Sequence, residues 1–298
     1  MILVTGTSGF IGSVLLDKII AKFGASNVLA LTSKPIDKCN YLLHNNYIFF
    51  SDFLIKSGFE NIDTIIHAGA FTPKNEKQAN ESFKCTSNII NTEALLKANI
   101  PNLKKFIFLS TLDVYSLYNG VLTEDSPIIP VSLYGQSKVY CEKMIASWAN
   151  QNQLLYQILR IGHVYGPGEE QYQKAIPVMI RKILNNEPIQ IFGTGDAIRS
   201  FIYIEDVVDA IIKSVDLEFF DGPINIVGGN QISIKDLAQL LIKNSESNTN
   251  VEFIKTTDIK QRDFIFDNSK MKKLLLKQEI DLAFGLKMEY NHMRNLSQ

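Results

Sequence analysis

The first twelve residues, MILVTGTSGFIG, constrain the fold of this chain more than any other stretch. The apolar run at residues 2–4 predicts a strand buried on both faces, and the apolar spacing after Gly12 predicts a helix. The glycines between them suit a tight turn, a close approach of backbone to a pyrophosphate, and close packing of helix on strand. The N–H groups at the helix N-terminus would face that anion. The stretch therefore predicts a dinucleotide site formed by Gly6, Ser8, Gly9, Phe10, Ile11 and Gly12.

Composition limits the classes of protein to which the chain can belong. Its 298 residues, 46% of them apolar, suffice for one large α/β domain or two unequal ones. The sequence shows no apolar run near the roughly 20 residues of a membrane span and enters a strand without a basic leader, so we expect a cytoplasmic protein. A net charge of −1 argues against a nucleic-acid surface. The three cysteines are isolated, which predicts neither disulfides nor a metal site.

Alternating strand and helix patterns continue to about residue 162 and predict a parallel, doubly wound sheet. We expect its strands at residues 2–4, 28–31, 47–50, 62–70, 105–110 and 154–161. A less regular remainder follows, and residues 160–168 are expected to leave the last of these strands as a loop.

The residues after the second expected strand bear on the choice of cofactor. In NAD-binding folds of this type, an acidic residue near the end of this strand usually holds the ribose 2′-hydroxyl. Here Thr32, Ser33 and Lys34 follow, and the next carboxylate is Asp37. A hydroxyl and an ammonium suit a 2′-phosphate, which a carboxylate would repel, so NADP is favoured and NAD is the alternative. Lys34 as an ordinary solvated loop lysine is the competing interpretation.

Residues at the carboxyl ends of later strands are expected to line the same crevice. Asp52 stands where an adenine amino group could be met, and Thr72 begins a loop that could face a substrate. His67 is expected to pack rather than to catalyse. The small residues that leave room for a cofactor are Ala68, Gly69 and Ala70.

Tyr134 and Lys138 lie four residues apart, so their side chains share one face of a helix. A free tyrosine has a pKa near 10, so only about 0.1% is ionised at neutral pH. A neighbouring ammonium and a cationic nicotinamide ring would both favour the phenolate, and lowering the pKa by about 2–3 units requires roughly 3–4 kcal/mol. Tyr134 would then act as general base or acid on a sugar hydroxyl or ketone during hydride transfer, with Thr111 bonded to the same oxygen.

The motifs VTGTSGFIG, HAGA, FIFLST, YGQSK and RIGHVYGPG, in this order, resemble the extended short-chain dehydrogenase/reductase family, in its nucleotide-sugar epimerase/dehydratase branch. The resemblance, from residue 1 to about 275, implies a Rossmann-type domain at 1–162 with about 202–228. It also implies a smaller α+β nucleotide-sugar-binding domain at 163–201 and 229–298. The implied catalytic set is Thr111, Tyr134 and Lys138. Tyr134 and Lys138 would also contact the cofactor, and Asp52 would meet the adenine.

The same resemblance implies where the nucleotide sugar would bind. Arg199 and Arg262 stand in segments like those that grip the diphosphate, and two guanidiniums suit a pyrophosphate. His163 replaces a common asparagine that contacts the sugar nucleotide, and Ser200 replaces the usual aspartate after the first arginine. The expected substrate contacts are Thr72, Thr111, Asp113, His163, Arg199 and Arg262.

Four functions remain open. The favoured one is an NAD(P)-dependent epimerase that oxidises a nucleotide sugar at C4 and re-reduces it on the other face. A reductase of 4-keto sugars that consumes NADPH is the alternative. A 4,6-dehydratase ranks below both, because Leu112 replaces the first acid of its Thr-Asp-Glu motif and leaves only Asp113. A silent, nucleotide-sensing binding partner is opposed by the intact catalytic set. The resemblance also implies a homodimer formed through the helices that carry Asn88 and Tyr134.

Overall fold

A computed structural model describes residues 1–44, 60–98, 100–115, 120–255 and 263–297. They form two compact units that are interleaved along the chain. The first unit comprises Met1–Leu117, Ser126–Ile161 and Val208–Ile224, and the second unit comprises Tyr118–Asp125, Gly162–Val207 and Asn225–Gln298.

Seven strands of the described residues form one sheet in the order β11-β7-β5-β4-β1-β2-β3. The chain leaves β1 toward β2 on one side and later returns to pair β4 on the other, which is the doubly wound arrangement. This confirms the predicted fold class. The strands are β1 (Ile2–Thr5), β2 (Val28–Thr32), β3 (Asn40–Leu43), β4 (Thr64–His67), β5 (Lys105–Thr111), β7 (Leu155–Ile161) and β11 (Ile224–Ile226).

The central strands are parallel and buried on both faces, as their continuous apolar runs predict. In the register, Val4 of β1 lies between Ala30 of β2 and Ile66 of β4. The expected strand at residues 47–50 lies outside the described residues. β3 was not predicted, and it follows β2 at the edge of the sheet.

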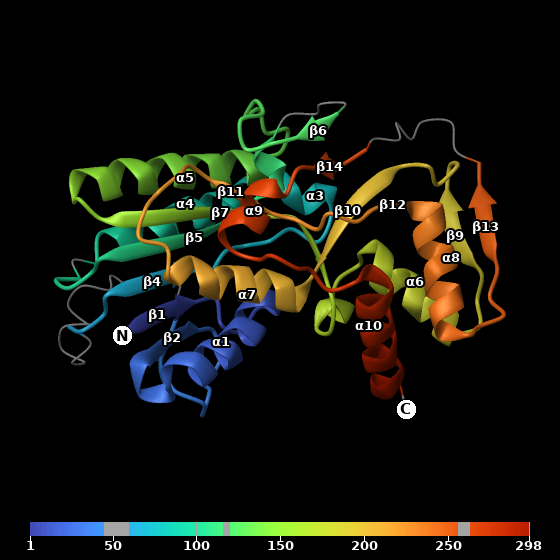
Figure 1. Ribbon diagram of the computed structural model, residues 1–298, viewed down its shortest axis with the longest axis horizontal. Helices are drawn as coiled ribbons and strands as arrows, with labels where there is room; N and C mark the ends of the chain where they lie inside the picture. Colours follow the sequence, from blue (N-terminus) through green and yellow to red (C-terminus); the bar gives the residue numbers. More distant parts are fainter. Residues whose placement is uncertain (45–59, 99, 116–119, 256–262, 298) are drawn as a thin grey trace. The chain divides into compact units, whose positions relative to one another are not determined.

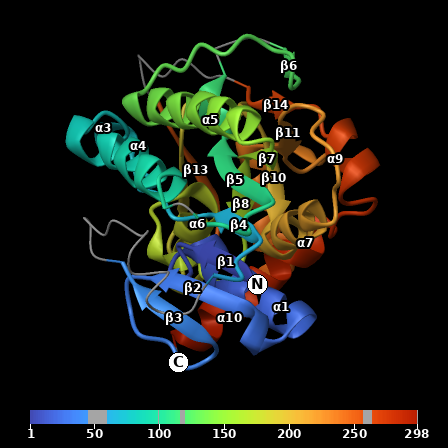
Figure 2. The ribbon, with the colours of Figure 1, turned by 90° about the vertical axis from the view of Figure 1, so that its left-hand side faces the viewer.

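Helices cover both faces of this sheet (Figures 1 and 2). α1 (Phe10–Phe23) and α7 (Ile204–Val215) lie on one face, and α4 (Ser82–Leu96) and α5 (Leu133–Gln151) lie on the other. Ion pairs join Lys18 to Asp209 at 2.7 Å and Lys22 to Asp216 at 3.1 Å. The short helical segments of this unit are η1 (Ala25–Asn27), α3 (Glu76–Ala79) and η2 (Leu112–Val114).

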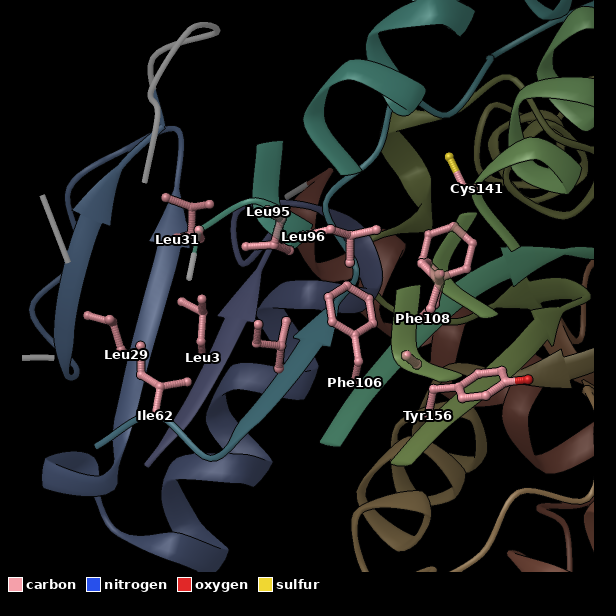
Figure 3. Close-up of a cluster of buried hydrophobic side chains, with 14 of the residues drawn as sticks. Leu3, Leu29, Leu31, Ile62, Leu95, Leu96, Phe106, Phe108, Cys141 and Tyr156 are labelled. Atoms are coloured by element: carbon pink, nitrogen blue, oxygen red, sulfur yellow. The ribbon is translucent and has the colours of Figure 1, made fainter. Parts of the chain in front are cut away.

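The core of the first unit lies between the sheet and the α4–α5 layer. Figure 3 shows its side chains reaching from β2 to β7, with Leu95 and Leu96 contributed by α4 and Cys141 by α5. Full burial of one such aliphatic or aromatic side chain stabilises the fold by about 1.5–3 kcal/mol. This core holds the strands in register and so fixes the loops at their carboxyl ends.

The last segment of the first unit is bonded into it from a distance in sequence. The ammonium of Lys105 donates to the backbone carbonyls of Val215 and Leu217. The side-chain amide of Gln157 donates to the carbonyl of Phe219. Residues 208–224 are therefore part of this unit's structure and not an appendage to it.

The second unit mixes small sheets with helices, which confirms the predicted α+β character. The order β12-β10-β8 forms one sheet, and β13-β9 and β14-β6 form two pairs. Residues 163–165 were expected in a loop but form β8, because they pair with Phe201–Tyr203. The helix α10 was not predicted. The strands of the second unit are β6 (Val121–Leu122), β8 (His163–Tyr165), β9 (Ile189–Phe192), β10 (Ile198–Tyr203), β12 (Gln231–Ser233), β13 (Val251–Ile254) and β14 (Ile265–Phe266). The helices of the second unit are η3 (Glu169–Gln171), α6 (Ala175–Leu184), α8 (Ile234–Ser245), α9 (Ser269–Leu274) and α10 (Leu282–Leu296).

Within the described residues, every helix falls short of the length and apolarity that a membrane crossing requires. Across the same residues, His, Cys, Asp and Glu side chains form no cluster of three that could hold a metal ion.

Candidate functional site

The glycine turn between β1 and α1 has the shape of a phosphate cradle. Gly6 has a φ of +73°, and a Cβ there would lie 2.6 Å from the Cα of Gly69. A Cβ on Gly12 would lie 2.0 Å from the carbonyl oxygen of Gly6. Gly9 is extended and precedes the first turn of α1 without a side chain to cap it. An uncapped helix N-terminus behind a tight turn is a binding position for a phosphate.

A cavity of about 310 Å³ opens at this turn, within the first unit. It lies at the carboxyl ends of β1, β2 and β4, where the strand order reverses and ligands bind in doubly wound sheets. Its volume is at the lower end of the range for small-molecule pockets, about 300–1,000 Å³. The cavity is lined by several of the residues that were predicted to bind the cofactor, namely Gly6, Ser8, Thr32, Ser33, Gly69 and Ala70.

The cavity also contains residues that were not predicted as ligands. They are Thr5, Leu31, His44, His67, Phe71, Ser87, Asn91 and Leu95. Ser87 and Asn91 could have been predicted from the sequence, because two polar residues four positions apart share one face of the helix α4. His44 follows β3, a strand that the apolar pattern did not reveal. Among the residues described around the cavity, none carries a carboxylate. These features fit a dinucleotide cofactor.

The remaining predicted cofactor residues lie beside the cavity or outside the described residues. Phe10 and Gly12 are buried in α1, and Ile11 and Ala68 are half-buried. Lys34 is exposed, and its carbonyl accepts from the hydroxyl of Thr32 at 2.9 Å. Asp52 lies outside the described residues.

The predicted catalytic hydroxyls come together at the end of β5. Thr111 caps η2, and its Oγ1 accepts from the backbone N–H of Asp113 at 3.2 Å. The Thr111 and Thr72 side chains are near enough to the Tyr134 phenol to lower its pKa. Gly135 makes this approach of α5 to η2 feasible, because a Cβ there would lie 2.4 Å from the Asp113 carbonyl oxygen.

Lys138 is buried behind Tyr134, one helical turn along α5. Its ammonium donates to the carbonyl of Leu109 at 2.5 Å and lies 4.2 Å from the centre of the Phe108 ring. Burial lowers the pKa of Lys138 to about 8, so the cation still predominates at pH 7.

The pKa of Tyr134 is shifted in the direction opposite to the one predicted. Burial of the phenol raises it, and the nearby Asp113 carboxylate raises it further. Hydrogen bonds from Thr111 and Thr72 favour the phenolate and offset part of this rise. Asp113 is accessible to solvent, so water screens its repulsion. The protein alone therefore holds Tyr134 as the neutral phenol.

A buried ionic network supports the face of α5 that carries Tyr134 and Lys138. Glu142, one turn beyond Lys138, accepts from Arg160 of β7 at 2.8 and 3.1 Å. The Ser110 hydroxyl donates to the same carboxylate at 2.5 Å, and Arg160 also donates to the Tyr115 hydroxyl at 2.9 Å. Removing one partner of a buried pair typically costs 3–5 kcal/mol. This network, which sequence reasoning missed, fixes α5 against β5 and β7.

In the second unit, two predicted substrate residues share an aromatic neighbour. The His163 and Phe264 ring centroids are 5.7 Å apart, and the Arg199 guanidinium lies 4.8 Å above the same phenylalanine ring. Burial, Arg199 and Lys174 together lower the pKa of His163 to about 4, so its imidazole is neutral at pH 7. Arg262 lies outside the described residues.

Comparison with known proteins places these features in context. A sequence model described as the NAD dependent epimerase/dehydratase family matches residues 2–226. The matched span includes the glycine turn, Thr111, Tyr134 and Lys138, and it also includes His163 and Arg199.

Curated relatives carry several activities. A dTDP-D-glucose 4,6-dehydratase of Dictyostelium discoideum is 32% identical over 81% of this chain and 61% of its own length. A putative UDP-glucose 4-epimerase of Methanocaldococcus jannaschii is 29% identical over 99% of both chains. A dTDP-4-dehydro-6-deoxyglucose reductase of Escherichia coli is 29% identical over 80% of both. The chain thus spans less than two thirds of the Dictyostelium relative and almost all of the Methanocaldococcus one.

Solved structures match along the whole chain. UDP-glucuronic acid 4-epimerase of Bacillus cereus, in complex with UDP-glucuronic acid and NAD, superposes with a TM-score of 0.84 at 29% identity and covers 99% of both chains. UDP-glucose 4-epimerase of Thermotoga maritima, with UDP-glucose, has the same TM-score at 26% identity, covering 100% of this chain and 99% of its own.

Proposed function

The chain belongs to the NAD dependent epimerase/dehydratase family, and from that premise we propose that it is a nucleotide-sugar 4-epimerase. The observation that carries the proposal is the hydroxyl cluster in the first unit. Tyr134 lies near the side chains of Thr111 and Thr72, and Lys138 follows it one helical turn along α5. The match to two 4-epimerases along almost their full length supports the same reaction.

In the proposed reaction, bound NAD or NADP supplies the acceptor and donor of hydride. Tyr134 removes the proton of the sugar C4 hydroxyl as that carbon is oxidised, and returns it when the ketone is reduced from the other face. Thr111 donates a hydrogen bond to the same oxygen. The protein alone holds Tyr134 as the neutral phenol, and the cationic ring of an oxidised nicotinamide cofactor would favour the ionised form when bound.

The Tyr134→Phe variant tests this mechanism. We expect kcat to fall by about 10²–10⁴-fold, the usual contribution of general acid–base catalysis, while cofactor affinity is retained. Tyr140→Phe is the matched control, because Tyr140 lies on the same helix with 56% of its surface exposed. Unchanged turnover in Tyr134→Phe would overturn the role proposed for Tyr134. Loss of turnover with unchanged activity in cells would favour a nucleotide-sensing role.

We propose a nucleotide-diphosphate sugar as substrate, with the first unit binding the cofactor and Arg199, His163 and Arg262 of the second unit contacting the substrate. The cationic Arg199 suits a diphosphate. The two solved relatives hold UDP-sugars, so UDP-glucose and UDP-glucuronic acid are the first compounds to test. A screen of UDP-, GDP-, CDP- and dTDP-sugars, with products identified by NMR, decides among nucleotides and sugars.

We propose that the site accepts NADP, although the solved Bacillus cereus relative holds NAD. Ser33 lines the cavity and is bonded to Ser8 at 2.8 Å, and Lys34 follows it. We expect Ser33→Asp to weaken NADP binding at least tenfold by repelling the 2′-phosphate, with NAD binding unchanged or tighter. Ser26→Asp, at an exposed site of η1, is the control. Equal NADP affinity in Ser33→Asp and the wild type would contradict the assignment.

A 4-keto-sugar reductase is the second candidate, favoured by the absence of carboxylates among the residues described around the cavity. The two activities differ in their demand for cofactor. An epimerase returns each hydride to its sugar, so purified protein that retains cofactor turns over without added NADPH. A reductase consumes one NADPH for each sugar.

We propose a homodimer formed through α4 and α5. Their outer surfaces expose apolar side chains, with Phe83 81%, Ile90 52% and Tyr140 56% exposed. Exposed apolar side chains gathered on packed helices are typical of a protein interface.

We also propose a cytoplasmic location. The cysteines in this structure are free, as in proteins of a reducing compartment, and cell fractionation would test that location.

A further inference from the structure

His67, at the end of β4, makes two buried hydrogen bonds to different elements. Its Nδ1 lies 2.8 Å from the hydroxyl oxygen of Thr5, at the end of β1. Its Nε2 lies 3.0 Å from the hydroxyl oxygen of Thr92, on α4. The ring also lines the cavity at the glycine turn. His67 thus joins the strand that enters the turn to the helix on the opposite side of the cavity.

Counting hydrogens assigns the direction of each bond. The Thr92 hydroxyl has one hydrogen and donates it to the carbonyl of Asn88 at 2.7 Å. Its oxygen must therefore accept from His67, which places a hydrogen on Nε2. Burial and the charges of Lys138 and His44 lower the pKa of His67 to about 3, so the ring is neutral and Nδ1 has no hydrogen. Thr5 consequently donates to Nδ1.

The oriented Thr5 hydroxyl has an acceptor lone pair left for the next loop. The backbone N–H of Gly69 donates to it at 2.8 Å. A side chain at Gly69 would disturb this contact, because its Cβ would lie 2.9 Å from the Thr5 hydroxyl oxygen.

The other end of the same loop is held from α4. The side-chain oxygen of Asn88 accepts from the N–H of Phe71 at 2.7 Å, and its amide donates to the Phe71 carbonyl at 3.2 Å. Residues 69–71 line the cavity, and they are held at Gly69 by Thr5 and at Phe71 by Asn88. His67 contacts Thr5 directly and reaches Asn88 through Thr92.

We propose that His67 is a positioning residue of the cofactor site, acting as the neutral Nε2–H tautomer that orients the Thr5 and Thr92 hydroxyls and thereby fixes residues 69–71. The inference rests on the proposed function only in taking this cavity as the NAD or NADP site. The tautomer itself can be tested on the wild-type protein without cofactor.

Nitrogen-15 NMR of the histidine rings tests the tautomer. We expect the His67 resonances to show an unprotonated Nδ1 and a protonated Nε2 from pH 8 to pH 5, assigned by their loss in His67→Asn. A protonated Nδ1, or a charged ring across this range, would overturn the proposal.

Cofactor affinity tests the positioning role. Loss of a buried hydrogen-bond partner costs about 1–3 kcal/mol, so we expect Thr5→Val and His67→Phe to raise the Kd of NAD or NADP by roughly 5–150-fold in calorimetry. We expect Thr5→Ser, and His67→Asn whose Oδ1 can replace Nδ1, to stay within about threefold of the wild type. Saturating cofactor should restore most of kcat in Thr5→Val.

Thr64→Val provides the structural control, since Thr64 is also buried in β4 but at the other end of the strand. We expect it to lower Tm without changing the Kd. Unchanged Kd values in Thr5→Val and His67→Phe, with a lowered Tm, would reduce His67 to packing and overturn the proposal. Failure of the wild type to bind either cofactor would overturn the proposed function and leave the tautomer result standing.

Discussion

Gly12 shows how a missing side chain determines the geometry of the glycine turn between β1 and α1. A Cβ at this position would lie 2.0 Å from the carbonyl oxygen of Gly6, a backbone atom that cannot rotate away. The same Cβ on Gly9 would lie 3.3 Å from that oxygen. We expect Gly12→Ala to lower the free energy of unfolding by about 1–3 kcal/mol and to weaken NAD or NADP binding.

Denaturant unfolding and calorimetric titration measure the two effects, and Gly9→Ala is the matched variant with the milder contact. Equal effects of the two substitutions would contradict the steric explanation. The spacing of Gly9 and Gly12 was readable from the sequence because both meet Gly6 within one strand–turn–helix segment, whereas the contact of Gly6 with Gly69 depends on folding.

Two buried histidines make stability depend on pH. The pKa of His67 is about 3 and that of His163 about 4, whereas an unfolded histidine has a pKa near 6.5. Between these values the unfolded chain binds protons that the folded protein does not, so stability is lost as pH falls below 6.5. The slope is about 1.4 kcal/mol per pH unit for each histidine.

We expect His67→Asn to reduce this slope between pH 6.5 and 4 by roughly the contribution of one proton. Urea unfolding of wild type and variant at several pH values measures the difference, in which the contributions of the carboxylates cancel. Parallel stability curves for the two proteins would contradict the neutral assignment of His67.

At the scale of elements, two buried carboxyl groups lie near each other, Glu289 on α10 and Glu169 on η3. Glu289 of α10 is 0% exposed, and within the described residues neither of its carboxyl oxygens has a hydrogen-bond partner. Burial and the adjacent Glu169 raise the pKa of Glu289 to about 9. The folded protein therefore keeps a proton that the unfolded chain releases near pH 4.5, and this contribution to stability is lost as pH rises toward 9.

We expect Glu289→Gln to remove this loss, so that the variant is more stable than the wild type at pH 8 and differs less from it at pH 5. The largest slope for one proton is about 1.4 kcal/mol per pH unit. Thermal unfolding across this range measures it, with Glu252→Gln at an exposed site of β13 as control. A constant stability difference across the range would contradict a protonated Glu289.

Elements with a local signature were predictable, and elements that depend on distant partners were not. β1, β2 and β5 are largely apolar runs in the sequence, and β4 has Ile65 and Ile66 at its centre. α10 was missed although Leu282, Leu286, Tyr290 and Met293 follow a helical period and Asp281 caps it. The bond from Glu142 to Arg160 joins two elements that no periodicity relates. The raised pKa of Tyr134 depends in the same way on folding, which buries the phenol and brings Asp113 near it.

At the scale of the whole molecule, the proposed dimer is a testable assembly. Ile90 of α4 is 52% exposed in the proposed interface, and a charge there would be desolvated on association. We expect the wild type to sediment as a dimer and Ile90→Asp to sediment largely as a monomer. Phe253→Asp, at a 54% exposed site of β13 in the second unit, should leave the dimer intact. A wild-type monomer at micromolar concentration would contradict the assembly.

The interleaving of the two units also bears on how the polypeptide is made and dissected. Residues 208–224, which accept the Lys105 and Gln157 hydrogen bonds, emerge from the ribosome only after all of residues 162–207 have been translated. A nascent chain therefore reaches about 220 residues before its first unit can be completed. Truncation near residue 162 removes residues 208–224 and, with them, the hydrogen-bond partners of Lys105 and Gln157. A fragment designed to contain the whole first unit must therefore include residues 208–224.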